Sequence, residues 1–453
     1  MKKMIVLIFS FCITLSSWGQ SNWKHGRLQV SPNGHFLQYA DGTPFFWLGD
    51  TGWDLFRKLK KEEIEKYLEN RKQKGFNVIQ AVILSDYPNK YGNRSFKDHD
   101  PLQAVEDYFE LVDWTVKKAL QKQMFMALLP TWGDKVTGSH HEAPLFNEAN
   151  AYAYGSFLGK RYKDDPNIIW VIGGDHPAFA DSADWRPVWR AMAKGLREGA
   201  GHPVLITYHP AGESSSTQFW KNEHTLDLHM MQSGHRTHDL PVWDWVKRDY
   251  DLTPAKPVLD GEPNYEDHPV NWDPKNGYFR DYDVRRQLYR SVFSGACGVT
   301  YGHNSVFQFY GQGDQKINFA DRYWTEALDC PGAFQAGYLK QLILSRPSLQ
   351  RVPDQSIIES GQGEGGEHIC AFRDSTGSYI MVYMPVGKTI TVNTSSIASR
   401  KLRAWWFDPQ TGRVSTIGKM SNSKSIQMTA PAQGKGNDWV LVIDDAAKKY
   451  GQP

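Results

Sequence analysis

The sequence predicts an α/β protein, a (β/α)8 TIM barrel followed by a small antiparallel β-sandwich. From about residue 45 to 307, short apolar runs alternate with amphipathic stretches, as in repeated strand–helix units. From about Pro347 onward, short alternating runs and turn residues replace that pattern, which is typical of a sandwich of roughly a hundred residues. We place the barrel at residues 20–346 and the sandwich at 347–453.

The apolar runs are short and continuous, which predicts strands of a parallel sheet buried on both faces. Eight such runs are present: Phe45–Gly49, Val78–Leu84, Phe125–Leu129, Ile168–Ile172, Val204–Thr207, Thr225–Met231, Val258–Asp260 and Gly298–Tyr301. Helical spacing of apolar residues predicts helices over Lys60–Lys74, Ala104–Gln121, Trp185–Glu198, Val284–Ser294 and Tyr323–Leu344. A doubly wound sheet is the alternative architecture. It usually carries a glycine-rich phosphate loop after its first strand, and Gly49–Trp53 lacks that pattern.

The C-terminal region predicts strands of its own. They lie over His368–Arg373, Ser378–Tyr383, Thr389–Val392, Arg403–Phe407 and Trp439–Ile443. Within the fourth of them, Trp405-Trp406 favours an interface with the barrel over a carbohydrate-binding platform.

The N-terminus predicts a signal peptide. Lys2 and Lys3 precede an apolar run, Met4–Leu15, that is too short to span a bilayer. We expect cleavage after Gly19, so that residues 1–19 are removed and the mature protein lies in the periplasm or outside the cell. No later segment is long and apolar enough to predict membrane insertion.

Composition excludes some classes of partner and favours one. A formal net charge of +2 argues against nucleic-acid binding, which usually shows a basic excess. Aromatic residues make up 13% of the chain, with 17 Trp. They build cores in most proteins, and in a cleft they also pack against the C–H faces of sugars. We expect an oligo- or polysaccharide as the partner.

The cysteines do not predict a disulfide-stapled scaffold or a zinc site. After signal removal Cys297, Cys330 and Cys370 remain, and no Cys-x-x-Cys pair occurs. Cys297 lies in an apolar stretch and is expected to be a buried thiol, whereas Cys330 and Cys370 could pair.

Active sites of TIM barrels form at the C-terminal ends of the strands, so polar residues just past each strand are candidates. Asp86, Tyr87 and His235 occupy such positions. The set that we expect to bind substrate is Asp50, Trp132, His176, Tyr208, His209, Gln232 and His303.

Two carboxylates stand out at the ends of strands four and seven, which face each other across a barrel mouth. Asp175 follows Gly173-Gly174, and Glu262 follows Gly261. Glycosidic bond cleavage needs one protonated and one ionised carboxyl group, and the glycines give the backbone room to bend. The structural alternatives are a turn or capping aspartate and a paired structural glutamate.

The sequence does not predict a metal site or a serine nucleophile. His224, His229, His235 and His238 lie in one segment, and His140-His141-Glu142 in another, but no His-Glu-x-x-His or Cys/His spacing occurs. The Gly-x-Ser-x-Gly pattern of a nucleophile elbow is also absent from the sequence. We therefore predict no metal and no cofactor.

Several stretches of the sequence, including those around Asp175 and Glu262, resemble the apiosidase-like family of glycoside hydrolases. The resembling stretches are Phe46–Thr51, Lys74–Gln80, Trp170–Pro177, Leu259–Pro263 and Gly295–Gly302. The C-terminal part is similar to the β-sandwich that follows this barrel, whose label is a collagen-binding domain of a collagenase. Nothing in Pro347–Pro453 suggests a protease or a collagen groove.

The resemblance implies release of apiose, a branched five-carbon sugar, from galacturonic acid in the pectin rhamnogalacturonan-II. It implies an acid/base role for Asp175 and a nucleophile role for Glu262 in an exo-acting, retaining enzyme. A galacturonate neighbour needs a cation, for which Lys135, Arg236 and Arg280 are candidates. Many barrel glycosidases have Asn-Glu where this chain has Gly174-Asp175, so the shorter aspartate requires a closer approach.

Three alternatives stay open at this point. The first is a glycosidase of the same fold that acts on another plant or host glycan. The second is a non-catalytic carbohydrate-binding protein on a decayed barrel. The third is a metal-dependent barrel hydrolase that uses the histidines.

Overall fold

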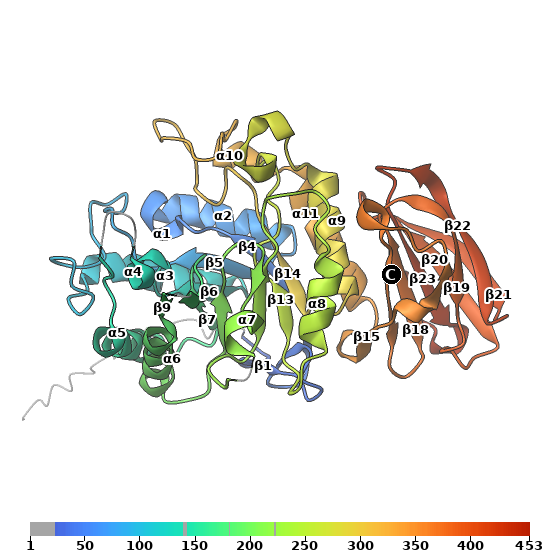
Figure 1. Cartoon of the computed structure of the whole chain (residues 1–453), viewed down its shortest axis with the longest axis horizontal. Helices are drawn as coiled ribbons and strands as arrows, with labels where there is room; N and C mark the ends of the chain where they lie inside the picture. The colour runs from blue at the N-terminus through green and yellow to red at the C-terminus, as the bar shows by residue number, and fades with distance from the viewer. Residues whose placement is uncertain (1–22, 139–142, 181, 222) are drawn as a thin grey trace, which may run out of the picture.

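The computed structural model describes residues 23–138, 143–180, 182–221 and 223–453. They form a barrel and an antiparallel sheet domain that lie side by side (Figure 1). The predicted signal peptide, residues 1–19, lies outside the described residues. Among the described helices, none has the length and apolar character needed to cross a bilayer.

Eight parallel strands form the barrel wall, and each overlaps one of the predicted runs. Their order in the sheet is β10-β7-β6-β5-β4-β14-β13-β12. The bounds are β4 Trp47–Thr51, β5 Val78–Val82, β6 Phe125–Leu129, β7 Ile168–Gly173, β10 Ile206–His209, β12 His229–Gln232, β13 Val258–Asp260 and β14 Gly298–Tyr301. The short strand β11 (Ser214–Ser215) pairs antiparallel with β12.

The two strands that end this sheet, β10 and β12, are joined through Asp227. Its backbone N–H donates to Ile206 O at 2.8 Å, and its carboxylate accepts from Ile206 N at 2.8 Å. Thr207 Oγ1 also donates to Leu228 O at 2.9 Å. These bonds, at the N-terminal ends of β10 and β12, close the barrel.

Side chains alternate between the inside of the barrel and its outer layer, as the pleat of a strand requires. In β6, Phe125 and Ala127 belong to the interior cluster, whereas Met126 and Leu128 belong to the outer cluster. A three-stranded sheet, β1 (Leu28–Val30), β2 (Leu37–Tyr39) and β3 (Pro44–Phe45), contributes side chains such as Leu37 to the interior cluster. This three-stranded sheet thus closes the N-terminal end of the barrel, and the cavity described below lies at the C-terminal end.

Helices cover the outside of the barrel. Their bounds are α1 Leu55–Lys58, α2 Lys61–Gln73, α3 Glu106–Gln121, α4 Asp134–Thr137, α5 Glu148–Arg161, α6 Arg186–Ala200, α7 Thr217–Trp220, α8 Val242–Tyr250, α9 Asp281–Phe293, α10 Trp324–Ala327 and α11 Pro331–Leu344. α5 and α6 pack backbone against backbone. A Cβ on Gly155 would lie 2.4 Å from Met192 O, and one on Gly195 2.2 Å from Tyr152 O.

The C-terminal domain consists of two antiparallel sheets, β15-β17-β18-β23-β20-β21 and β16-β19-β22. The bounds are β15 Arg351–Pro353, β16 Ile358–Ser360, β17 Cys370–Asp374, β18 Tyr379–Met384, β19 Gly387–Asn393, β20 Lys401–Phe407, β21 Val414–Ser421, β22 Ser425–Gly434 and β23 Trp439–Asp445. The larger sheet lies against α9 (Figure 1). One apolar cluster includes the barrel helices and Trp405, whereas Trp406 belongs to the cluster between the two sheets. The predicted interface role is therefore correct for Trp405 and wrong for Trp406.

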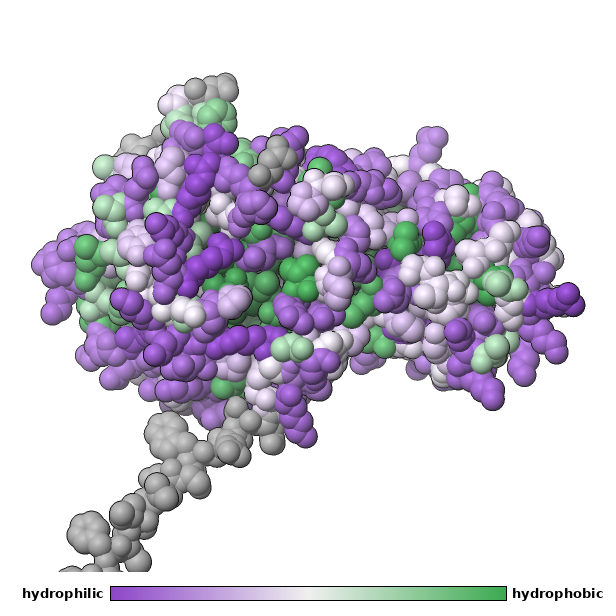
Figure 2. Space-filling model, turned by 90° about the horizontal axis from the view of Figure 1, so that it is seen from below, coloured by the Kyte–Doolittle hydropathy of each residue, from purple (hydrophilic) through white to green (hydrophobic). Residues whose placement is uncertain are grey.

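The three cysteines in the described part of the chain are buried free thiols, so Cys330 and Cys370 do not pair. The expectation for Cys297 is confirmed. On the face that Figure 2 shows, hydrophilic side chains surround a hollow in which apolar side chains gather.

Candidate active site

The C-terminal ends of the barrel strands surround a cavity of about 440 Å³. Asp175 and Glu262 both line it, as do Trp132 and Gln232 from the predicted substrate-binding set. Loop residues that the sequence did not single out, among them Trp53, His268 and Trp272, complete the wall. The two candidate carboxylates therefore share one cavity with aromatic walls.

Asp175 is positioned by a tight curl of backbone at the end of β7. Gly173, Gly174 and Asp175 all have positive φ, at 98°, 96° and 59°. A Cβ on Gly173 would lie 2.4 Å from His209 O, so only glycine fits there. Gly174 N donates to His209 O at 3.0 Å, and Gly133 N donates to Gly174 O at 3.0 Å. These bonds pin the curl between the ends of β6 and β10.

Glu262 follows β13 and contacts two histidines. His235 Nε2 is 3.2 Å from Glu262 Oε1, and His209 Nε2 is 2.9 Å from Oε2. The His209 contact is short but not well directed as a hydrogen bond. Gln80 Nε2 donates to Gly261 O at 2.9 Å and fixes the backbone before the glutamate. Glu262 is 6% exposed, so its carboxylate depends on these neighbours rather than on bulk water.

Backbone hydrogen bonds fix the tautomer of both imidazoles. His209 Nδ1 accepts the N–H of Asp175 at 3.2 Å, and His235 Nδ1 accepts the N–H of Tyr265 at 3.4 Å. A ring nitrogen that accepts carries no proton, so each ring proton is on Nε2. Both Nε2–H groups therefore face the carboxylate of Glu262.

The environments of the two carboxyl groups drive their pKa values apart. Burial, and then the charge of Glu262, raise the pKa of Asp175. Burial pushes the pKa of Glu262 upward, but the contacts with His209 and His235 outweigh it and hold that pKa well below its ordinary value. Asp175 is thus suited to be an acid and Glu262 an anion, which is the division that acid-assisted bond cleavage requires.

Asp260, on the strand that precedes Glu262, lies below the cavity. It accepts hydrogen bonds from Ser233 Oγ at 2.8 Å and Ser291 Oγ at 3.0 Å, and burial raises its pKa to about 6. It does not line the cavity.

Two neutral buried acceptors in the cavity wall have no hydrogen-bond partner. Gln232 donates from its amide to Asp175, and its Oε1 is unpaired. His268 Nδ1 contacts Pro269 O at 2.7 Å and donates there, since a carbonyl only accepts, which leaves the Nε2 lone pair unpaired. Burial and the neighbouring His235 lower the pKa of His268 to about 3, so the ring stays neutral. An unpaired buried acceptor is costly, and a ligand hydroxyl would satisfy it.

Trp272 is an exposed aromatic side chain on this wall. It is 45% exposed and packs edge-on against His235 and His268. Trp272 and the preceding Asn271 both have positive φ, at 57° and 53°. Asparagine adopts this backbone readily, but it is strained for tryptophan, and such strain concentrates at functional sites.

Several predicted substrate-binding residues do not line the cavity. Asp50 is fully buried and binds Arg71 at 2.6 Å and Tyr67 at 2.5 Å, on the outer side of β4. Tyr208 also points outward, toward Trp189 and Trp220. The prediction that Asp50 and Tyr208 line the cavity is therefore wrong. It selected residues at strand ends, and that rule does not tell inward-pointing from outward-pointing side chains.

The other predicted histidines differ in their surroundings. His209 touches Glu262 from within the barrel. His176 contacts Gly174 O through Nδ1 at 2.9 Å and lies outside the cavity lining. His303 is buried against Asp267, 3.3 Å away, and is not part of the lining either. The prediction that His176 and His303 line the cavity is therefore wrong as well.

Within the described residues, one group of side chains has the spacing of metal ligands: Asp267, His303 and Cys330. It lies outside the cavity lining. Asp267 contacts both Arg280 and Arg322, and the guanidinium groups occupy the positions that a cation would take. The cluster is therefore an ion-pair network.

The three candidate cations, Arg236, Lys135 and Arg280, lie in different places relative to the cavity. Arg236 lines the cavity; its side chain is 64% exposed, and Nε is 3.0 Å from Glu213 Oε1. Lys135 lies between Asp86 and Asp134, at 2.8 and 3.2 Å, in the wall of a neighbouring cavity. Arg280 lines neither cavity.

Two carboxyl groups whose pKa values are driven in opposite directions, in one aromatic cavity at the mouth of a TIM barrel, are the arrangement of a glycoside hydrolase. The chain belongs to the apiosidase-like family. The family model "Apiosidase-like, catalytic domain" matches residues 31–350, and "Putative collagen-binding domain of a collagenase" matches residues 352–444.

Solved structures agree with this assignment. A structure titled "Glycoside hydrolase" is 37% identical, with a TM-score of 0.88 over 95% of this chain and 99% of its own. A glycoside hydrolase family 5 structure from Bacteroides vulgatus ATCC 8482 is 36% identical, with a TM-score of 0.88 over 95% and 96% of the two chains. Among curated proteins, a probable GTP 3',8-cyclase of Saccharolobus islandicus is 31% identical over 71 residues. That match covers 16% of this chain and 22% of the cyclase, so it carries no function over.

Proposed function

We propose that this protein is an exo-acting, retaining glycosidase that releases apiose from galacturonic acid in rhamnogalacturonan-II. Glu262 is the nucleophile and Asp175 the acid/base. The observation that carries the proposal is the opposite displacement of the two pKa values within one cavity. Two carboxyl groups with the same protonation state would not support this chemistry.

In the first step, the carboxyl group of Asp175 donates its proton to the glycosidic oxygen as the bond to the anomeric carbon breaks. The carboxylate of Glu262 attacks that carbon, so a glycosyl ester forms and the alcohol leaves. In the second step, the Asp175 carboxylate takes a proton from water, and the oxygen of that water attacks the anomeric carbon. The ester bond to Glu262 breaks, and the sugar leaves with its configuration retained.

His209 and His235 act on this sequence through Glu262. Their Nε2–H groups stabilise its negative charge, which keeps it ionised beside a protonated neighbour. Loss of the Glu262 charge on ester formation lowers the pKa of Asp175, because that charge is one of the two main causes of the raised value. Asp175 therefore changes from acid to base as the reaction proceeds.

The substrate part of the proposal rests on the family and on the cavity wall. Gln232 Oε1 and His268 Nε2 are acceptors for hydroxyl groups of a small sugar. Arg236 is the one Arg or Lys side chain among the described residues that line the cavity. Its guanidinium, which is exposed beside Glu213, is the cation that we propose for a uronate carboxylate next to the cleaved bond.

Incubation with rhamnogalacturonan-II oligosaccharides tests the substrate, with the released monosaccharide identified by chromatography. Apiose as the first product supports the proposal, a different sugar indicates another glycan, and no release from any oligosaccharide overturns it. NMR of the first product tests the stereochemistry, since an initial anomer opposite to that of the substrate would exclude a retaining mechanism.

A matched set of variants tests the residue roles. Glu262→Gln should lower kcat by about 10⁴-fold or more, since the residue bonds covalently to the sugar. Glu198→Gln is the control, because Glu198 is exposed on α6 and lines neither the candidate catalytic cavity nor the neighbouring one. It should keep kcat within a few-fold of the wild-type value.

Export is a further part of the proposal. The basic residues and short apolar run at the N-terminus support secretion to the periplasm or beyond. N-terminal sequencing of protein recovered from that compartment should give Gln20 as the first residue. Full-length protein confined to the cytoplasm would contradict this part.

A further inference from the structure

The candidate catalytic cavity adjoins a second cavity of about 360 Å³. Trp53, Trp132, Phe307 and Ile317 line both, so their side chains form the shared boundary. The far wall of the second cavity carries Tyr87, which is 66% exposed. The Arg57 guanidinium lies over the Tyr87 ring, 5.8 Å from its centroid. A large exposed ring in a cleft is available to a ligand.

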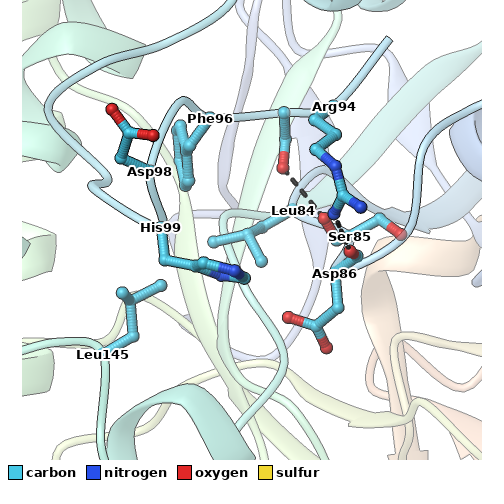
Figure 3. Close-up of a pocket in the computed structure, with 9 residues that line it drawn as sticks. Leu84, Ser85, Asp86, Arg94, Phe96, Asp98, His99 and Leu145 are labelled. Atoms are coloured by element: carbon cyan, nitrogen blue, oxygen red, sulfur yellow. Dashed lines mark hydrogen bonds between the residues drawn. The ribbon is translucent and has the colours of Figure 1, made fainter. Parts of the chain in front are cut away.

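A third cavity of about 230 Å³ shares Leu84, Ser85 and Asp86 with the second. Figure 3 shows the His99 ring, the Asp86 carboxylate and the Arg94 side chain around it. Arg94 Nη1 donates to Asp86 O at 2.9 Å, which ties the two sides of this loop together. The three cavities thus adjoin one another in a row that begins at the cavity of Asp175 and Glu262, and we refer to the second and third together as the cleft.

The charges of the second cavity are compensated within the protein. Arg57 Nε donates to Asp54 at 2.8 Å, and Lys135 lies between Asp86 and Asp134. With three carboxylates and two cations in its lining, the cavity has no excess of positive charge for an acidic sugar. Paired charges instead offer donors and acceptors to hydroxyl groups.

We propose that this cleft binds further uncharged sugar residues on the leaving-group side of the cleaved bond, with Tyr87 as the stacking platform for the first of them. The inference rests on the proposed glycosidase function and extends it, because it assigns the enzyme a substrate several sugars long. The ring of Tyr87 packs against the apolar C–H face of a sugar, while Lys135 and Asp86 bind its hydroxyls.

The test compares two substrates with the same cleaved sugar. One is an apiosyl oligosaccharide from rhamnogalacturonan-II that carries further neutral sugars, and the other is 4-nitrophenyl apioside. Tyr87→Ala should lower kcat/KM for the oligosaccharide by roughly ten-fold and change it less than two-fold for the nitrophenyl glycoside. Tyr87→Trp should restore oligosaccharide turnover, since it keeps an aromatic face and removes the hydroxyl.

Tyr152→Ala is the control, because Tyr152 is exposed on α5 and lines none of the three cavities. Equal losses on both substrates, or no loss on either, would overturn the inference while the glycosidase function stands. If the wild-type enzyme turns over neither substrate, the proposed function fails and the inference fails with it.

Discussion

One imidazole joins the two carboxylate positions of the site: His209 Nδ1 accepts the backbone N–H of Asp175, and His209 Nε2 lies 2.9 Å from Glu262 Oε2. The ring is fully buried and packs edge-on against Trp53, so it cannot rotate freely. The hydrogen bond from the Asp175 N–H holds the backbone turn Gly173–Asp175 in place. The contact with Glu262 stabilises the negative charge of that carboxylate. We regard His209 as a positioning residue that sets both geometry and protonation.

His209→Ala should therefore shift the pH profile as well as the rate. Without one of its two N–H neighbours, the pKa of Glu262 rises, so the acidic limb of kcat/KM should move upward by roughly one pH unit. The rate at neutral pH should fall about ten-fold or more. His176→Ala, which alters a neighbour of Asp175 without touching Glu262, should leave the acidic limb in place. An unchanged limb in His209→Ala would remove the proposed electrostatic role.

Asp175→Ala should remove the basic limb of the profile. The acid form of Asp175 is active in the first step, and its raised pKa keeps it protonated to higher pH than an ordinary aspartate. In the wild type, kcat/KM should fall as the pH rises through that pKa. With a nitrophenyl glycoside the variant should still form the glycosyl ester, because the leaving group needs no proton. Azide should then restore turnover and yield a glycosyl azide of retained configuration, whereas lack of azide rescue would contradict the assignment.

His268→Phe tests the unpaired acceptor of the cavity wall. Phenylalanine keeps the ring stacked beside His235, 4.5 Å away, but cannot accept a hydrogen bond. We expect kcat/KM to fall by about five- to ten-fold, the value of one hydrogen bond, with no new pH dependence because the ring is neutral. A deoxy analogue of the substrate that lacks the bound hydroxyl should be turned over equally by both enzymes. A difference that persists for every such analogue would indicate a packing role instead.

The barrel strands were predictable because each is buried on both faces, which makes runs of mostly apolar residues. Strands β21 and β22 were missed for the opposite reason, since their side chains are mostly exposed and polar. Helix α5 was missed because its contact with α6 is made by glycines such as Gly155 rather than by large apolar residues. Hydrophobic periodicity does not detect an interface built from backbone.

The site was predictable only to the level of strand ends. The rule located Asp175, Glu262 and Gln232, but it placed Asp50 and Tyr208 in the cavity although both point outward. An offset of one residue reverses the direction of a strand side chain, and the sequence does not fix that register. His268 and Trp272 come from a loop beyond β13, where no motif marks them; the observed signal is the positive φ of Asn271 and Trp272.

The joint between the two domains gives a last prediction, on stability. Arg285 on α9 forms a bidentate pair with Asp438, with Nε and Nη2 at 2.8 and 2.7 Å, and the two side chains are 1% and 0% exposed. Arg285→Met leaves a buried carboxylate without its cation, which should cost about 3–5 kcal/mol. Because the same apolar cluster runs through both domains, thermal unfolding should remain a single transition at a lower Tm.

Arg373→Ala provides the matched comparison within the C-terminal domain. Its pair with Asp354, at 2.7 Å, is partly exposed at 30% and 23%, so its loss should cost under about 1 kcal/mol. Two separate transitions in Arg285→Met would show that the domains are stable independently, whereas a cost no larger than that of Arg373→Ala would show that the buried pair contributes little to stability. A single transition would instead mean that the two domains unfold together, as expected from the packing of the larger sheet on α9.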